Sequence, residues 1–212
     1  MPQTHYDADE FDEAAMAARI RRAALFVRYL VNDFNINLYE MYLNNAKRQK
    51  NVMTLLPGTV TSQVGSPTSN YAMAVFEMTE DDAIIIELDR VPNAAYWSFQ
   101  VGDVWSRSLE YMTRQSSLND VQLAADTDDA IRVVVSIKDP GMKNWLDTCG
   151  RVEGTIVFRN YRTIGTPVPK SRLVKFSEIG KWLPKDTARV TPAERQAAML
   201  ERRRCMLKWY GE

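Results

Sequence analysis

The sequence predicts a mainly β protein: an antiparallel β-sandwich or jelly roll that follows an amphipathic helical segment and precedes a C-terminal helix. Two observations carry this prediction. Apolar residues recur at every second position in the middle of the chain, but at every third or fourth position near its two ends. The apolar segments of the middle part are short and separated by turn residues. We therefore expect a helical segment at residues 9–47, a sandwich domain at residues 51–165, and a polar connection with a capping or docking helix at residues 166–212.

The first expected element is an amphipathic helix. Its acidic residues precede its basic residues, an order that complements the helix dipole. We expect its apolar stripe to pack on the protein's own body, and we expect the Asn-rich residues 32–37 to break or kink it. A contact with a second copy or with a partner protein through residues 20–41 stays open, because the steps of the stripe also suit a short heptad seam. The stripe consists of Ile20, Ala24, Val27, Val31, Phe34, Leu38 and Met41.

Five strands are expected in the middle of the chain. Each is apolar, β-branched or aromatic, and turn residues bound it on both sides. Strands of this length with short connections favour antiparallel pairing, which is the basis of the sandwich prediction. The strands are residues 71–78, 83–89, 95–101, 131–137 and 154–161.

The last expected element is a helix at residues 191–210. Thr191 is its N-cap, Pro192 is its first residue, and Glu194 completes a capping box. We expect this basic, amphipathic helix to cap the domain or to lie in solvent, while docking to a partner protein stays open. Its apolar and basic residues are Ala197, Leu200, Arg202, Arg203, Arg204, Cys205 and Leu207.

The composition is that of an ordinary soluble globular protein. The chain has 212 residues, of which 45% are hydrophobic and 25% are charged, and 27 basic residues balance 27 acidic ones. A nucleic-acid partner is not expected, because no face of the main body concentrates basic residues. Neither a signal peptide nor an apolar run of about 18 residues is present, so no membrane contact is expected. Two cysteines in unlike contexts favour a reducing compartment, and we expect a cytoplasmic protein.

Missing residue types exclude the common catalytic classes. His5 is the single histidine and lies in the N-terminal tail, so nucleophile systems that need an imidazole base are excluded. The same count excludes zinc and iron sites that contain histidine. Because the chain contains neither a Walker motif nor GxGxxG, nucleotide use is not expected. We expect no metal and no cofactor, and we interpret Cys149 as a small buried residue rather than a nucleophile.

The loop at residues 139–148 is the most informative segment. It holds two turn residues, an indole, a carboxamide, a carboxylate and a hydroxyl, and loops placed by a rigid sheet often carry binding groups. If it meets the polar and aromatic connection at residues 105–119, the two segments form a cleft for a small organic or sugar-like ligand. The expected ligand-binding residues are Trp97, Gln100, Trp105, Arg114, Asn119, Asn144, Trp145 and Arg159.

A catalytic role for the same loop is the alternative. Asp147 would act as a general base, with Tyr111 or Arg114 stabilising developing charge. A structural interpretation of each residue also stays open. The tryptophans would then lie in the core, Asp147 would brace its own loop, and the amides would hold loops through backbone hydrogen bonds.

Several short segments resemble a bacterial family, the domain-of-unknown-function family number twelve-fourteen. This domain is the C-terminal part of uncharacterised, virulence-associated proteins. The resemblance covers the chain from about Tyr71 onward, and Asn-Trp-Leu-Asp-Thr is its most specific motif. It implies a jelly-roll-like sandwich and no established activity. It also implies a large N-terminal domain, which many members carry and which the helical segment replaces here. The segments are residues 96–100, 108–111, 114–119, 139–141, 144–148, 183–184 and 191–195.

Three functions are compatible with these observations. The first is a non-catalytic binding module, or the small subunit of a complex, which holds a small ligand in the cleft. The second is a carboxylate-dependent enzyme that acts on a small molecule without histidine. The third is a structural protein that associates with itself through the first helix. We favour the first, because it needs no missing residue type and leaves two amphipathic helices for docking.

Overall fold

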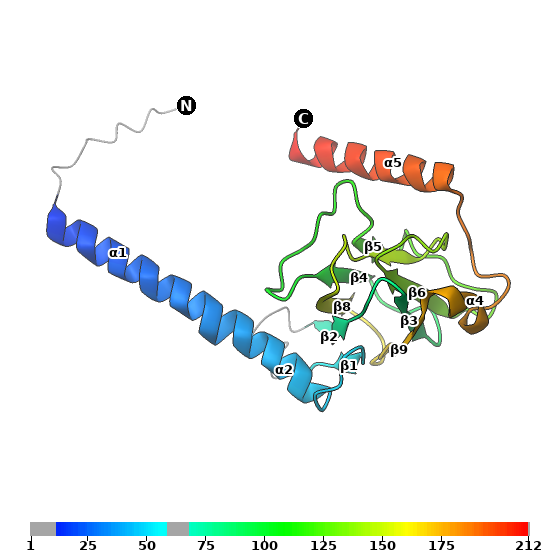
Figure 1. Ribbon diagram of the computed structural model, residues 1–212, viewed down its shortest axis with the longest axis horizontal. Helices are drawn as coiled ribbons and strands as arrows, with labels where there is room; N and C mark the ends of the chain where they lie inside the picture. Colours follow the sequence, from blue (N-terminus) through cyan, green and yellow to red (C-terminus); the bar gives the residue numbers. More distant parts are fainter. Residues whose placement is uncertain (1–11, 59–67, 212) are drawn as a thin grey trace. The chain divides into compact units, whose positions relative to one another are not determined.

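The computed structural model describes residues 12–58 and 68–211 (Figure 1). The chain divides into two compact units, Met1–Leu38 and Tyr39–Glu212. The first unit is helical, and the second contains the β-sheets and the C-terminal helix. A mainly β sandwich with a helix before it and a helix after it is therefore confirmed.

The N-terminal helical segment consists of three successive elements. Helix α1 (Glu13–Arg28) begins at Asp12, whose side chain accepts hydrogen bonds from the N–H groups of Ala14 and Ala15. A π-helical stretch, η1 (Tyr29–Ile36), follows, and helix α2 (Asn37–Asn45) completes the segment. The irregular stretch overlaps the Asn-rich residues 32–37, where we expected a kink. Asn35 Nδ2 donates to the Leu30 carbonyl at 2.7 Å, which adds a side-chain bond to the helical backbone there.

The apolar stripe is exposed along α1, whereas its residues Val31, Leu38 and Met41 are half-buried. No residue of α1 or η1 is buried, and Ile20 and Val27 are 63% and 58% exposed. The expectation that the protein's own body covers these side chains stays a prediction. The spacing of apolar residues shows that a helix has an apolar face, but it does not show which surface covers that face.

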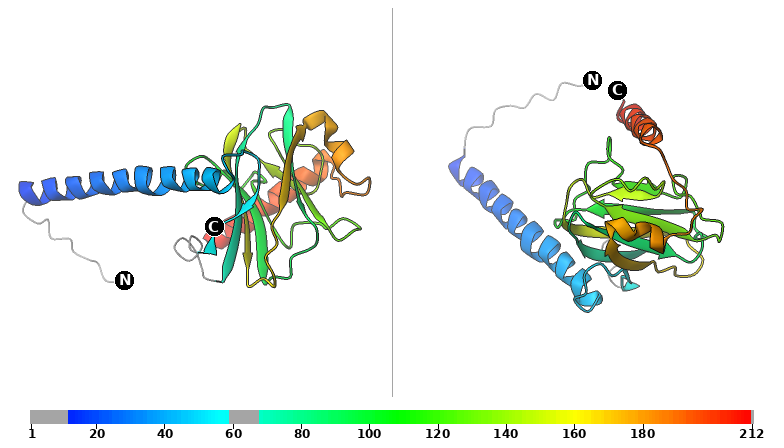
Figure 2. Two further views of the ribbon diagram at one scale, coloured as in Figure 1. Left: turned by 90° about the horizontal axis from the view of Figure 1, so that it is seen from below. Right: turned by 45° about the vertical axis from the view of Figure 1, so that its right-hand side comes forward.

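The sandwich consists of two sheets that face each other (Figure 2). Strand pairing is antiparallel except between β6 and β7, which are parallel. The first sheet has the order β1 (Thr54–Leu55), β2 (Ser69–Glu77), β8 (Glu153–Tyr161), β4 (Tyr96–Gly102) and β5 (Ser117–Asn119). The second has the order β7 (Trp145–Asp147), β6 (Ile131–Ser136), β3 (Asp82–Leu88) and β9 (Lys170–Lys175).

The main core lies between the two sheets. Alternate residues of each strand point inward, as the period of two requires. Phe99 and Phe158 lie side by side on neighbouring strands with ring centroids 4.8 Å apart, and both are fully buried. Gly154 allows β8 to approach the end of β4 closely, because a Cβ at position 154 would lie 2.3 Å from the Gly102 carbonyl oxygen.

A second, smaller core covers the outer face of the β3–β6 sheet. The short elements η2 (Phe176–Glu178) and α4 (Ile179–Trp182) supply its cover, and α4 lies beside β3 in Figure 1. Its buried residues are Ala83, Ile85, Val134, Met142, Val174, Ile179 and Leu183.

The five expected strands are present, but four strands were not expected. β9 lies in the region for which we expected a polar connection, so the sandwich extends beyond residue 165. β9 is an edge strand with exposed Lys170 and Lys175, a composition that protects sheet edges from aggregation and hides the period of two. β1, β5 and β7 have only two or three residues each, too few for a periodic signal.

We predict that Gly154→Ala destabilises the sandwich by about 2 kcal/mol or more, because the added methyl group collides with Gly102 and with Phe76. Gly180→Ala is the control, since nothing lies within 4 Å of its Cβ position and it occupies a helix. Chemical denaturation followed by Trp fluorescence measures both variants. Equal free energies of unfolding for the two variants would contradict the close approach of β4 and β8.

Candidate functional site

Hydrogen bonds to backbone groups hold the loop at residues 139–148 in place. Asn144 is buried, and its side-chain oxygen accepts from the Ala124 N–H at 2.9 Å. Its Nδ2 donates to the carbonyls of Ala124 at 2.7 Å and Arg132 at 2.9 Å. An amide with three such bonds joins two loops and a strand, so Asn144 has a structural role here in place of the expected ligand contact.

Trp145 is enclosed within the same loop. Its indole N–H donates to the Ser136 carbonyl at 3.2 Å, and only 7% of the residue is exposed. The guanidinium carbon of Arg195, from the C-terminal helix, lies 5.1 Å from the ring centroid. Protein groups therefore occupy both the polar edge and one face of the indole.

Asp147, the candidate base, is paired on both carboxylate oxygens. Arg114 donates to it twice, from Nε at 2.6 Å and from Nη2 at 2.9 Å, and the Cys149 N–H donates to Oδ1 at 2.7 Å. The hydrogen bonds with Asp147 raise the pKa of Arg114. Asp147 therefore braces its loop and anchors Arg114, and both of its carboxylate oxygens already accept hydrogen bonds from the protein.

The surroundings of Cys149 affect the ionisation of its thiol. Burial raises the pKa of its thiol, and the nearby Asp147 carboxylate adds to the effect. A raised pKa disfavours the thiolate, which is the reactive form. This agrees with the structural interpretation of Cys149 from the sequence.

Helix α5 (Pro192–Tyr210) is attached to the loop through a buried arginine. The helix begins at the expected capping box of Thr191 and Glu194. Arg195 donates to both carboxylate oxygens of Asp139, at 2.9 and 3.3 Å, and to Gln115 Oε1 at 3.0 Å. It also donates to the Met142 carbonyl. Its guanidinium thus fixes three parts of the loop region from the helix.

A second buried arginine attaches α5 two turns further along. Arg202 donates from Nε to the Tyr111 carbonyl at 2.7 Å and from Nη2 to the Ser117 carbonyl at 2.6 Å. Burial lowers the pKa of Arg202. The Tyr111 hydroxyl, a candidate catalytic group, is hydrogen-bonded to the Tyr210 hydroxyl at 2.8 Å. Tyr111 therefore contributes a contact with α5.

Sequence reasoning did not single out Arg195, and it grouped Arg202 with its solvated neighbours. A signal was present, because the two arginines are seven residues apart and Met199 lies between them at helical spacing. These three positions lie on one face of a helix and belong to the side that contacts the sandwich. Two arginines in line with a methionine at helical spacing are the sequence feature that could have identified them.

Of the remaining expected ligand residues, Gln100, Asn119 and Arg159 lie on the outer face of one sheet, whereas Trp97 does not. Trp97 lies in the main core at 3% exposure, edge-on to Phe99, and therefore has a packing role. Gln100 lies on the outer face of the sheet, where its Nε2 donates to Ser108 Oγ at 2.7 Å. Trp105 is 44% exposed in the loop after β4.

Asn119 and Arg159 also have local partners. Asn119 and Gln122 exchange two hydrogen bonds between backbone and side chain, at 3.0 and 3.1 Å, which closes the turn after β5. The Arg159 guanidinium lies 5.6 Å from the centre of the Tyr71 ring on the neighbouring strand. Arg159 thus contributes a cation–π pair across β2 and β8.

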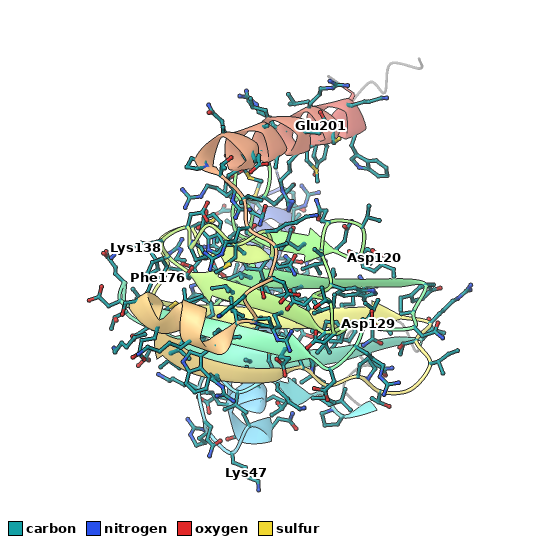
Figure 3. The ribbon with its side chains drawn as sticks, turned by 90° about the vertical axis from the view of Figure 1, so that its right-hand side faces the viewer. Lys47, Asp120, Asp129, Lys138, Phe176 and Glu201 are labelled. Carbon is teal, nitrogen blue, oxygen red and sulfur yellow. The ribbon has the colours of Figure 1, made fainter. Side chains whose placement is uncertain are left out.

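A hollow of about 530 Å³ lies at another part of the sandwich. The N–H of Val91, a lining residue, donates to the Asp129 carbonyl at 3.0 Å, so the hollow lies near Asp129. Asp129 precedes β6 and Lys138 follows it, and the two residues lie at opposite ends of that strand (Figure 3). The loop at residues 139–148 begins beside Lys138 and returns along β6, where Asn144 binds the Arg132 carbonyl. Two loops line the hollow, with Leu88, Asp89, Arg90, Val91, Pro92, Asn93, Ile164, Gly165, Thr166, Pro167 and Val168.

No group of three or more His, Cys, Asp or Glu side chains within residues 12–58 and 68–211 is arranged to hold a metal ion. Within the same part of the chain, no helix has both the length and the apolar character needed to cross a membrane.

Comparisons with known proteins support the fold and assign no activity. No family model and no curated protein matches the chain. A solved structure of an uncharacterised protein from Burkholderia cenocepacia is similar, with a TM-score of 0.62 and 26% identity over 66% of this chain and 39% of that chain. A protein from Vibrio parahaemolyticus matches with a TM-score of 0.42 and 18% identity, over 56% of this chain and 34% of its own. The chain is thus similar to an uncharacterised protein from Burkholderia cenocepacia, and it spans well under half the length of both matched chains.

We predict that Asp147→Asn lowers the free energy of unfolding by about 2–3 kcal/mol, because the buried end of the Arg114 pair loses its charge and its bidentate acceptor. Asp81→Asn is the control; its carboxylate is 88% exposed, and we expect a change within about 0.5 kcal/mol. Chemical denaturation compares the two variants. If both changes were equally small, the bracing role of Asp147 would be wrong.

Proposed function

We propose that the protein is a non-catalytic subunit that docks onto a partner protein through its N-terminal helical segment. The observation that carries this proposal is the exposed apolar surface at the junction of α1 and η1. Within the stretch at residues 23–31, Leu25 and Phe26 are 59% and 61% exposed, and Arg28 is the single charged residue. A helix that is apolar on most of its sides is normally covered by other protein.

The charges on this segment favour a partner with a carboxylate-lined rim. Arg19, Arg21, Arg22 and Arg28 are exposed and interleaved with the apolar residues. Opposite charges around an apolar contact raise the association rate and select the partner. A parallel, in-register contact with a second copy of the chain is disfavoured, because it would bring arginines against arginines. A helix-in-groove contact with a different chain satisfies both the apolar and the basic residues.

Membership in the domain-of-unknown-function family number twelve-fourteen remains a proposal. It suggests which kind of polypeptide the partner is. Many members of that family carry a large domain before the sandwich. Under this proposal the partner is a polypeptide with a comparable domain. The carboxylate-dependent reaction has less support, because Asp147 and Tyr111 already have protein partners.

The test is affinity purification of the tagged full chain from its own host, with quantitative mass spectrometry of the proteins retained. We expect one protein retained in a stoichiometric amount. The double variant Leu25→Glu/Phe26→Glu should reduce its retention about tenfold or more, because two carboxylates would be placed in an apolar groove. Gln196→Glu, which adds a carboxylate on the exposed side of α5, should retain it fully.

Two results would contradict the docking proposal. One is equal retention of every protein by wild type and by the double variant. The other is a dimer mass in light scattering of the purified wild type that becomes a monomer mass in the double variant. The second result would show that the helix binds another copy of this chain.

A further inference from the structure

We propose that the hollow between the β3–β4 loop and the β8–β9 loop binds a small organic anion with an apolar body. The proposal is independent of the docking function, because the hollow lies within the unit Tyr39–Glu212 and the docking surface lies in the other unit. A negative result for one proposal therefore does not contradict the other.

The hollow is built on the end of the sandwich core. Leu88, the last residue of β3, is 2% exposed and forms part of the floor, together with the buried Pro92. Its volume of about 530 Å³ is within the range of small-molecule sites. The floor is continuous with the main core through Leu88, so it does not depend on the position of a mobile side chain.

Backbone hydrogen bonds hold its two walls together. The Asn93 carbonyl accepts from the Ile164 N–H at 2.8 Å and from the Thr163 hydroxyl at 3.3 Å. On the other side, the Val91 N–H donates to the Asp129 carbonyl at 3.0 Å. A site whose walls are fixed before binding loses little conformational entropy when a ligand enters.

The walls are apolar and open to solvent. Val91, Ile164 and Val168 are 44%, 75% and 42% exposed, and all three line the hollow, as does Pro167. Apolar side chains gathered around a concavity at this exposure are a feature of binding sites more than of ordinary surface. They favour a ligand with a hydrocarbon body.

The charge at the rim is positive. Asp89 is neutralised by Lys170, whose Nζ donates to its two oxygens at 2.6 and 2.9 Å. Arg90 follows directly and is exposed, and none of the ion pairs in the described part of the chain involves it. A guanidinium without a protein carboxylate beside an apolar concavity is suited to a carboxylate or another anionic head group.

The test is a titration of the isotope-labelled full chain with sodium hexanoate, followed residue by residue through amide chemical shifts. 1-Hexanol, which has the same chain without the charge, is the matched neutral probe. We expect hexanoate to shift the amides of residues 88–93 and 164–168. We expect hexanol to shift the same amides with roughly fivefold weaker affinity, the factor typical of one exposed charge-assisted bond.

Three variants sharpen this experiment. Arg90→Gln should weaken hexanoate about fivefold and leave hexanol unchanged. Ile164→Asp should weaken both probes, because it removes an apolar wall; its side chain is mostly exposed, so folding is unaffected. Arg151→Gln, an exposed arginine elsewhere, should change neither affinity.

Three outcomes would overturn the proposal. The first is the absence of shifts at residues 88–93 and 164–168, including the case in which only the apolar helix responds. The second is equal affinity for hexanoate and hexanol in wild type. The third is the same loss of hexanoate affinity in Arg90→Gln and Arg151→Gln.

Discussion

Two buried arginines of α5 determine how the loops at one end of the sandwich are arranged. A buried guanidinium is costly unless its donors are satisfied, and those of Arg195 and Arg202 bond to the carbonyls of Met142, Tyr111 and Ser117. Arg195 also holds the Asp139 carboxylate, from a position 56 residues further along the chain. The helix and the loop therefore fix each other's position. The loop at residues 139–148 connects α5 to the sandwich in this way, and we call it the joint.

The hydrogen bonds of the joint limit the functions that its side chains can perform. Three polar side chains of the joint bind groups within the protein: Asn144 binds backbone groups, Asp147 binds Arg114, and the Trp145 indole binds a carbonyl. The buried Thr148 hydroxyl has no hydrogen-bond partner among the described residues. Hydrogen-bonding groups committed in this way favour rigidity over catalysis. Free apolar surface and uncompensated charge occur elsewhere, on the N-terminal helical segment and around the hollow between the β3–β4 loop and the β8–β9 loop. Our proposals of docking and of ligand binding rest on these two places.

Sequence reasoning predicted those parts of the fold whose causes are local. The period of two located β2, β3, β4, β6 and β8, and Thr191 with Glu194 located the start of α5. It missed β9, where lysines and arginines protect an edge, and it missed very short strands. The residue types of the 139–148 loop were identified, but their roles were not, because the partner Arg195 comes from a distant helix. A periodic pattern likewise identifies the apolar face of the first helix but not the surface that covers it.

Native-state hydrogen exchange of Arg195→Met tests the central claim most directly, namely that α5 holds the joint in place. In wild type the Lys143 N–H donates to the Ala188 carbonyl and the Asp147 N–H to the Gln115 carbonyl. We predict that the variant accelerates exchange of these two amides roughly a hundredfold, because Asp139 and Gln115 lose a buried cation, while the amides of β2 and β8 keep their protection. Arg203→Met, at an exposed position of the same helix, should leave all of them unchanged. Equal protection of the Lys143 and Asp147 amides in the two variants would contradict this account.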